Sequence, residues 1–404
     1  MKILYSLPHP ADRLGMQGAG HLVRATALIN ALQNRGHQLT RMEAAAGAAA
    51  GTPVNTYRRV VKRVMPRRFA MILRDWGRIQ FGKAYGGRLA QAAREMQPDL
   101  ILETHIAFSL GGKIASERTG IPLVLDDCAP AWEEEREYGV GLGHQANSIH
   151  REVTGHAKLL VAVNKSMHRL LLEEGAASEK VITIENGIDP GYFRPQPGNS
   201  ARREQYHIPQ DAMVVVFVGS FQRFHRVDLL LQAFQQVLSF ERAHLLLVGA
   251  GQTYEECRAL AAGLGLTGRV TFTGGVPHEE VASYIAAGDM AIVPAHSDYA
   301  NPMKLYEYMA LGKAVLAPRQ STITEIVTDG LDALLFEPGN AAAMADGMLR
   351  LLRDPVLRER LGAAAKKLAL SQTWDHRAAT LEAALLKIIT IDHEPDQCPP
   401  PSSS

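Results

Sequence analysis

The chain has 404 residues, a formal net charge of +1, 46% hydrophobic residues and three widely separated cysteines. A single hydrophobic core rarely supports this length, so we expect two domains with a cleft between them. The balanced charge argues against a nucleic-acid partner, the short apolar N-terminal run against a signal peptide, and the odd number of cysteines against a disulfide framework. We therefore expect a cytoplasmic protein without a membrane-spanning segment.

The first half of the chain alternates short aliphatic runs with helical patterns, which is typical of a parallel sheet wrapped by helices. A glycine-rich turn at 15–20 follows the first run and leads into a helix from His21 to about Gln33. Together these patterns predict an α/β, doubly wound, Rossmann-like domain over residues 1–190. Its predicted strands are, in chain order, 2–7, 38–43, 99–105, 122–127, 159–164 and 180–186.

The segment 186–200 is rich in Gly, Pro and Asn, which marks a connection between domains. Beyond it the alternation repeats and predicts a second doubly wound domain over 191–373. Its predicted strands are 213–219, 244–251, 269–275, 290–295 and 314–318. Because ligands bind at the carboxyl ends of such strands, the loops that should surround the cleft are 15–20, 219–226 and 295–303. The Pro- and Ser-rich segment 392–404 is expected to be a disordered tail.

The stretch 58–94 carries eleven Lys or Arg residues and a single acidic residue, Asp75, interleaved with large apolar side chains. This pattern predicts a basic amphipathic helix face. Three interpretations stay open: peripheral contact with an anionic membrane surface, here the inner face of the membrane, a groove for an acidic acceptor, or a solvated helix face.

The turn GMQGAG at 15–20 lies between a strand and a helix, where backbone N–H groups can bind a phosphate. Gly18 and Gly20 are its candidate binding residues. A tight structural turn is the alternative, because glycine-rich turns are common in doubly wound sheets. The glycine spacing does not match the G-x-G-x-x-G fingerprint, which argues against a nicotinamide enzyme.

A second candidate site follows the strand at 213–219, where Gly219 begins a loop that contains Arg223, His225 and Arg226. Cations at the mouth of a strand suit a diphosphate, although ordinary surface arginines would give the same sequence. A third candidate is the segment NPMKLYEYMALG, which begins at Asn301.

In this third segment Pro302 should sit at the start of a helix and leave the backbone N–H groups of Met303 and Lys304 available to an anion. Glu307 lies one turn later, on the same face of the helix as Lys304. One carboxylate and exposed amides can bind a ribose and a diphosphate together. The alternative is a surface ion pair between Lys304 and Glu307, which would contribute almost nothing.

Several motifs, taken in order, resemble the donor domain of the retaining glycosyltransferases of family 4. They are VGSFQRFHRVDLLLQAF (218–234), GGVPHEEVASYIAAGDMAIVPA (274–295) and SDYANPMKLYEYMALGKAVLAP (297–318). The resemblance extends over nearly the whole chain before the tail. It implies the GT-B fold, with the donor nucleotide in the second domain, the acceptor in the first, and a C-terminal helix, about 374–391, that returns to the first domain.

The resemblance also implies roles for single residues. Glu307 is similar to the second Glu of the family's Glu, seven residues, Glu motif, which binds the donor ribose. The backbone amides of Met303 and Lys304, in the segment that starts at Asn301, would meet the diphosphate. Val276 would border the nucleobase.

Two places depart from the family pattern. The first Glu of the motif, which usually contacts the donor sugar, falls on Tyr299, with Asp298 beside it. The Arg that commonly follows the glycine is Ser220 here, and the usual Lys-Gly pair falls on His225-Arg226. The cation that neutralises the diphosphate therefore stays open among Arg223, His225, Arg226 and Lys304.

A histidine of the first domain often faces the donor sugar in this family, and the matching position holds Asp127 or Cys128 here. His105, which ends the preceding strand after Glu103, is either a cleft residue or a structural one. Neighbouring residues of a strand face opposite sides, so only one of Asp126 and Asp127 can point into the cleft. The candidate catalytic residues are thus His105, Asp127, Arg223 and Lys304.

The resemblance implies replacement at the anomeric carbon with retention of configuration. The co-substrate would be a nucleotide-diphosphate sugar, a UDP-sugar first and GDP-mannose next, with no obligatory metal or other cofactor. The acceptor would be a glycan, a lipid-linked molecule or a small molecule. Two alternatives stay open: a catalytically silent paralogue that binds nucleotide sugar or a partner protein, and a sugar epimerase of the GT-B fold. A glycogen-type phosphorylase would need a lysine-bound pyridoxal phosphate and a much longer chain.

Overall fold

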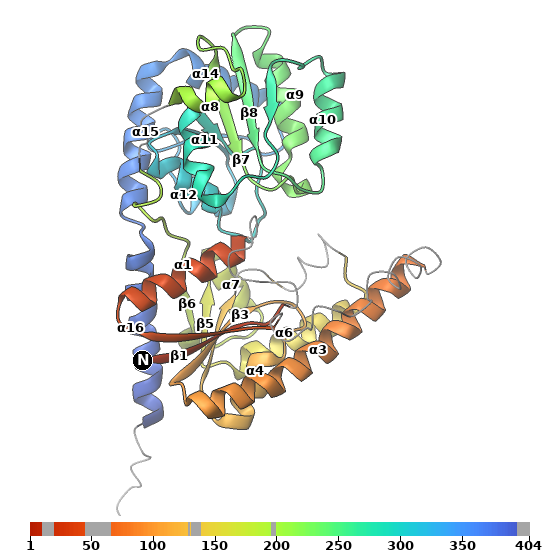
Figure 1. Ribbon diagram of the computed structural model, residues 1–404, viewed down its shortest axis with the longest axis vertical. Helices are drawn as coiled ribbons and strands as arrows, with labels where there is room; N and C mark the ends of the chain where they lie inside the picture. Colours follow the sequence, from red (N-terminus) through yellow and green to blue (C-terminus); the bar gives the residue numbers. More distant parts are fainter. Residues whose placement is uncertain (10–19, 45–65, 128–129, 131–138, 195–198, 394–404) are drawn as a thin grey trace, which may run out of the picture.

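The structure is a computed structural model that describes residues 1–9, 20–44, 66–127, 130, 139–194 and 199–393 (Figure 1). Four of the predicted features lie wholly or partly outside these residues. They are Gly18 with most of the turn at 15–20, the basic residues at 58–65, Cys128, and the proposed tail from residue 394 onward.

The first half of the chain forms a sheet of six strands in the order β2-β1-β3-β4-β5-β6. All neighbouring strands run parallel, as the aliphatic runs predict for a sheet buried on both faces. Every predicted strand of this half is present; β1 and β2 have the predicted bounds, and the other four are one to four residues shorter. The strands are β1 (Lys2–Leu7), β2 (Gln38–Glu43), β3 (Leu100–His105), β4 (Leu123–Asp127), β5 (Leu159–Ala162) and β6 (Val181–Thr183).

Helices cover both faces of this sheet. One face carries α3 (Arg67–Met96), α4 (Gly111–Thr119), α6 (Gly143–His156) and α7 (Lys165–Glu173). The other face carries α1 (Gly20–Asn34) and α16 (Trp374–His393), which share one apolar core that includes Leu28 and Leu381. Figure 1 shows α16 running down from the second domain to lie beside α1. The returning helix is therefore present. It extends to His393, so the prediction that the tail begins at residue 392 is wrong for residues 392–393.

The second half forms another sheet of six strands in the order β12-β11-β10-β7-β8-β9, again wholly parallel. Five of these strands match predictions, and the short β12 was not predicted. The strands are β7 (Met213–Val218), β8 (Ala243–Val248), β9 (Val270–Phe272), β10 (Met290–Ile292), β11 (Ala314–Pro318) and β12 (Leu334–Phe336). In both sheets the chain reverses its winding next to the first strand, between β1 and β3 and between β7 and β10. Ligand crevices form at such switch points.

The second sheet is also covered on both faces. One face carries α9 (Val227–Val237), α10 (Tyr254–Gly263) and α14 (Ala341–Arg353), and the other α11 (Val281–Ala287), α12 (Met303–Ala310) and α15 (Pro355–Leu370). The shorter helical segments are α8 (Asn199–Gln205), α13 (Ser321–Thr324), η2 (Ser178–Lys180), η3 (Arg223–His225) and η4 (His278–Glu280). Within the described ranges, no helix combines the length and the apolar character that crossing a bilayer requires.

A buried arginine joins α1 to the sheet of the first domain. The Arg24 guanidinium donates hydrogen bonds of 2.8–3.1 Å to the Asp126 carboxylate and a further bond of 2.8 Å to the carbonyl of Ile184. Both charged side chains are 2% exposed. A third contact, of 3.0 Å, reaches the Asn186 side-chain oxygen. Asp126 therefore faces α1, while its neighbour Asp127 points to the opposite face, as the alternation of strand residues predicts.

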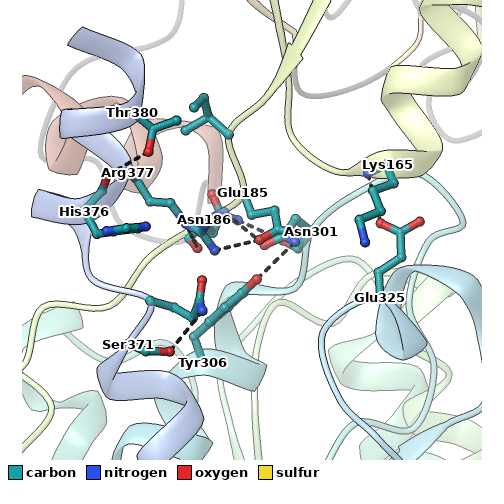
Figure 2. Close-up of polar contacts among 12 residues, drawn as sticks. Lys165, Glu185, Asn186, Asn301, Tyr306, Glu325, Ser371, His376, Arg377 and Thr380 are labelled. Atoms are coloured by element: carbon teal, nitrogen blue, oxygen red, sulfur yellow. Dashed lines mark hydrogen bonds and ion pairs between the residues drawn. The ribbon is translucent and has the colours of Figure 1, made fainter. Parts of the chain in front are cut away.

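The two domains meet through the loop that precedes α12 (Figure 2). Asn186 donates from its side chain to the backbone oxygen of Asn301 at 2.9 Å, and Asn301 in turn donates to the Tyr306 hydroxyl at 3.4 Å. Asn164 of the first domain donates to the backbone oxygen of Tyr299 at 2.6 Å. First-domain side chains thus hold the loop that we expect to bind the donor. The residues at which the domains begin and end, 190 and 373, stay predictions.

Candidate functional site

The loop after β7 contains a glycine that lies directly against a lysine. A Cβ atom added to Gly219 would lie 2.7 Å from Nζ of Lys304, and one added to Gly249 would lie 2.0 Å from the Gly219 carbonyl oxygen. The backbone contact makes glycine necessary at 249, whereas Gly219 is favoured by its φ of +156°, a backbone conformation that other residues rarely adopt. The two glycines leave the room in which the Lys304 ammonium reaches the end of β7.

Lys304 lies in the first turn of α12, which begins after Pro302 without a side-chain cap among the described residues. Its Nζ is 2.8 Å from Nε2 of His225 and 5.0 Å from the centre of the Phe217 ring. The lysine is buried, and burial lowers its pKa to about 7, although the Glu307 carboxylate opposes this shift. A pKa of about 7 leaves the Lys304 amine only partly protonated at neutral pH.

Two histidines surround this lysine. Nδ1 of His225 faces the carbonyl oxygen of Ser220, so Nδ1 carries the proton and Nε2 accepts from Lys304. The His296 ring is stacked near that of His225, with centroids 6.1 Å apart, and is also buried. Burial and the nearby Lys304 lower the pKa of both histidines, that of His296 to about 3. The three basic groups, which we call the donor cluster, are buried together, and an anion entering the cluster would favour their protonation.

Glu307 lies one turn beyond Lys304 on α12. It is buried, and burial raises the pKa of its carboxyl group, with His278 and Lys304 acting in the opposite direction. Among the described residues its carboxylate has no hydrogen-bond partner. Glu307 and Met303 line a cavity of about 610 Å³ between α12, η4, α1 and the connection at 187–193. The alternative of a surface pair between Lys304 and Glu307 is therefore wrong, since both side chains are inside the molecule.

Comparisons of the sequence with known proteins show the family to which the chain belongs. Residues 19–192 match the family described as Glycosyltransferase Family 4, and residues 199–368 match the one described as Glycosyl transferases group 1. The D-inositol 3-phosphate glycosyltransferase of Thermomonospora curvata is 30% identical over 74% of this chain and 73% of its own length. The chain belongs to glycosyltransferase family 4. The similar enzyme of Acidothermus cellulolyticus, also 30% identical, is matched over 66% of this chain, which spans only 62% of that relative's length.

Solved structures show that this family 4 protein has the GT-B fold. Sucrose-phosphate synthase from Thermosynechococcus elongatus superposes with a TM-score of 0.77 at 18% identity, covering 97% of this chain and 100% of that one. Anabaena HepE in complex with UDP-glucose superposes with a TM-score of 0.73 at 19% identity, covering 96% and 100%. At these identities the likeness concerns the fold, and it agrees with the two facing Rossmann-like domains that the sequence predicts.

The family 4 chain brings only two of its four candidate cations together. Lys304 and His225 are in contact, whereas the Arg223 side chain is 67% exposed beside Glu256. Arg226 is 45% exposed and paired with Asp228. The short helix η3 directs the side chains of Arg223 and Arg226 to the surface and that of His225 inward, so the role of the two arginines as diphosphate ligands stays a prediction.

The remaining candidates of the donor domain lie around the cluster. Val276 is half-buried and packs on the core beneath β10 and β11, and Tyr299 is half-buried with its carbonyl bonded to Asn164. Asp298 is exposed and accepts a bond of 3.3 Å from Gln320. In the first domain, Gly20 is the exposed first residue of α1.

The first-domain candidates His105 and Asp127 are buried, 4% and 0% exposed, against His150 of α6. Nε2 of His105 is 3.0 Å from Nδ1 of His150. Glu103 is fully buried and accepts from Ser6 and Ser109, and burial raises its pKa to about 7 despite these bonds. The hypothesis that His105 and Glu103 line the open cleft is therefore corrected: both side chains lie inside the first domain.

Sequence reasoning missed several residues of the site. They are His150, Glu174, Asn164, Asn186 and His296. Asn164 and Glu174 lie at the two ends of α7, and His296 directly follows the predicted strand 290–295. Polar residues at the ends of buried strands are the one signal that could have indicated His296.

Proposed function

We propose that the protein is a retaining glycosyltransferase that takes its sugar from a nucleoside diphosphate sugar, UDP-linked first and GDP-mannose next. The observation that carries the proposal is the buried pair of Lys304 and His225 one helical turn from Glu307. The Glu307 carboxylate accepts no hydrogen bond from the described residues and could accept them from a ribose. A buried carboxylate and a buried ammonium at the start of a helix suit the ribose and the diphosphate of one ligand.

In this proposal the bond between the anomeric carbon and the diphosphate oxygen breaks, and the acceptor oxygen bonds to the same face of that carbon. The proton of the acceptor hydroxyl leaves with the departing phosphate. Lys304 takes up a proton as the diphosphate binds, and together with the backbone N–H groups of Met303 and Lys304 it stabilises the charge that develops on the leaving group. The proposal includes no obligatory cofactor.

The donor class rests on Anabaena HepE, which has been solved in complex with UDP and with UDP-glucose. For the acceptor, the similar proteins named D-inositol 3-phosphate glycosyltransferase make that cyclitol phosphate one compound to test, beside glycans and lipid-linked molecules. Tyr299 stands where a glutamate would contact the donor sugar, so the donor sugar itself is best identified by mass spectrometry of the products.

Replacement of Glu307 by Ala tests the donor site. A ligand present at one hundred times its Kd stabilises the folded state by about 2.7 kcal/mol. We expect UDP or GDP, and their sugars, to raise the melting temperature of the wild-type protein. In the Glu307→Ala variant we expect the affinity to fall by about tenfold to a hundredfold, because hydrogen bonds to a charged group are worth about 1.5–3 kcal/mol.

The control is Glu255→Ala, since that side chain is 78% exposed on α10. Its nucleotide-dependent stabilisation should equal that of the wild type. If no nucleotide stabilises the wild-type protein, the proposal of a nucleotide-sugar donor fails. If a nucleotide does so but Glu307→Ala responds equally, only the assignment of Glu307 fails.

The surface of α3 supports a second proposal, that the enzyme rests on an anionic membrane. Phe69, Ile72, Leu73 and Trp76 are 64%, 37%, 54% and 58% exposed, and their spacing places them on one face of the helix. Soluble helices normally bury such a face. We call these four residues the α3 stripe.

The prediction of a continuous basic face over 58–94 needs correction within the described residues. Four arginines of α3 are bound to their own domain rather than free: Arg74, Arg78, Arg88 and Arg94 donate to the carbonyl oxygens of Gly139, Ala107, Ala44 and Arg118. Arg68 is exposed at the start of the helix, beside a groove of about 580 Å³ that Ile72 also lines. The apolar stripe is therefore the main feature of this face.

Co-sedimentation with liposomes tests the membrane proposal. We expect the wild-type protein to sediment with vesicles that contain phosphatidylserine more than with neutral vesicles. A Leu73→Ser/Trp76→Ser variant should lose most of this binding, because each side chain would otherwise bury apolar surface in the interface. Phe240→Ser is the control, since Phe240 is 63% exposed in the second domain. If the wild-type protein does not bind the vesicles, or if the double variant binds them equally well, the membrane proposal fails and the α3 stripe is a solvated helix face.

A further inference from the structure

A cluster of potential metal ligands lies inside the first domain, away from the donor cluster. His105 and Asp127 are the last residues of the neighbouring strands β3 and β4 and are paired in register. His150 reaches them from α6. One ligand atom from each of the three residues lies within 4.8 Å of the others. All three side chains are buried, with exposed fractions of 4%, 0% and 3%.

Hydrogen bonds leave one nitrogen of each histidine in this cluster without a partner among the described residues. For His105 this atom is the buried Nδ1. Nε2 of His150 lies 2.9 Å from a Glu174 oxygen, yet neither atom has hydrogen-bond geometry. Buried polar atoms without a partner are rare in folded proteins, and a bound ion is one of the few explanations for several of them in one place.

The unpartnered nitrogen of His150 is directed toward two carboxylates. Its Nε2 lies 3.9 Å from Oδ2 of Asp127 and 2.9 Å from Oε2 of Glu174. Its other nitrogen, Nδ1, lies 3.0 Å from Nε2 of His105, and this hydrogen bond holds the two rings together. An ion held by Nε2 of His150 and by Asp127 would therefore engage a nitrogen that has no hydrogen-bond partner among the described residues.

We propose that His105, Asp127 and His150 bind one divalent transition-metal ion, with Zn²⁺ the best match. Two imidazole nitrogens and one carboxylate oxygen suit Zn²⁺, whereas Mg²⁺ and Ca²⁺ prefer oxygen ligands alone. The ion would join β3 and β4 to α6 at the carboxyl edge of the first sheet, and its role is structural because the ligands are buried. This proposal replaces the expectation of no metal site, and it makes His105 and Asp127 ligands rather than reacting groups.

The test uses the full-length protein with any purification tag removed. The protein is stripped with EDTA, incubated with a small excess of ZnCl₂, desalted and analysed by inductively coupled plasma mass spectrometry. We expect one zinc per chain. Substitution of Co²⁺ should give the visible absorption bands of a four-coordinate site, which report nitrogen and oxygen ligands without any activity assay.

Two variants and a control assign the ligands. His150→Gln and Asp127→Asn should each retain less than about a tenth of the zinc, whereas His156→Gln, on the same helix and bonded to Ser116 at 3.0 Å, should retain all of it. Because the donor cluster is in the other domain, stabilisation by UDP shows whether a variant is folded, and the two proposals can fail separately. Zinc below a tenth of an equivalent in the wild type, or equal zinc in all three variants, would overturn the metal site.

Discussion

The Lys304→Met variant should bind nucleotide at least a hundredfold more weakly than the wild type and yet melt at a higher temperature when no nucleotide is present. Both effects follow from burial. The lysine has an ordinary pKa of 10.5 and a pKa of about 7 in the folded protein. A difference of one pKa unit corresponds to about 1.36 kcal/mol. The difference between 10.5 and about 7 therefore means that keeping the ammonium charged in the folded state costs about 5 kcal/mol.

Methionine fills a similar volume without that cost. It leaves Nε2 of His225 without its present partner, which costs about 1–3 kcal/mol, so we expect a net gain of about 2 kcal/mol at pH 6. The pKa of Lys304 is lower in the folded than in the unfolded state. The cost is therefore complete below pH 7 and disappears as the pH rises toward 10.5, and the gain in the variant should disappear with it.

Nucleotide affinity should show the matching pH dependence. Above pH 7 the free protein has lost the Lys304 proton, so binding of the diphosphate must take up a proton again. We expect the Kd for UDP, measured by calorimetry, to rise by up to tenfold per pH unit between pH 7 and 9. A phosphate ionises fully by pH 7, since its second pKa is about 6, and so does not add to the slope. In Lys304→Met the slope should be absent.

Lys313→Met is the matched control. Lys313 is also a lysine whose pKa burial lowers, to about 8, but its Nζ donates to the backbone oxygens of Ala286 and Gly288, away from the donor cluster. This variant should keep the stabilisation by UDP whatever happens to its own melting temperature. If UDP stabilises Lys304→Met as strongly as the wild type, Lys304 is not part of the nucleotide site.

The Arg24→Met variant should lose about 3–5 kcal/mol of stability, the largest loss that we expect from a single charged residue. Removal of the guanidinium takes three hydrogen bonds from the buried Asp126 carboxylate, and breaking a buried ion pair in this way has this cost. Arg24 also holds Asn186, which supports Asn301 in the loop before α12. A smaller loss of UDP affinity should therefore accompany the loss of stability.

Chemical denaturation of the variants, followed by circular dichroism, measures this effect. The double variant Arg24→Met/Asp126→Leu should recover most of the lost stability, because apolar residues of similar volume can replace a buried ion pair. Arg242→Met is the control, since Arg242 and its partner Asp211 are 61% and 60% exposed and such pairs contribute about 0–1 kcal/mol. A loss below 1 kcal/mol in Arg24→Met would show that the pair does not hold α1 on the sheet.

The sequence alone determined most of the fold and predicted that the segment around α12 binds the donor. Eleven of the twelve strands follow from aliphatic runs, because the strands of a parallel sheet are buried on both faces and their composition records this directly. The α12 segment is equally local: a proline at the N-cap, a lysine in the first turn and a glutamate one turn later belong to one short stretch. The short β12 was missed because three residues carry too little pattern.

Only the tertiary structure decided which side chains act together. Lys304 and His225 are in contact although 79 positions separate them in the sequence, and Arg24 and Asp126 although 102 do. Periodic sequence patterns predict no contacts between residues so far apart in the chain. Arg223 and His225 are two residues apart in sequence, yet one is exposed and the other is inside the cluster. The pKa of Lys304 depends on how completely water is excluded from its side chain. The exposure of the α3 stripe depends on whether another element of the fold packs against it. Both are properties of the assembled three-dimensional structure, which residue types and spacing do not record.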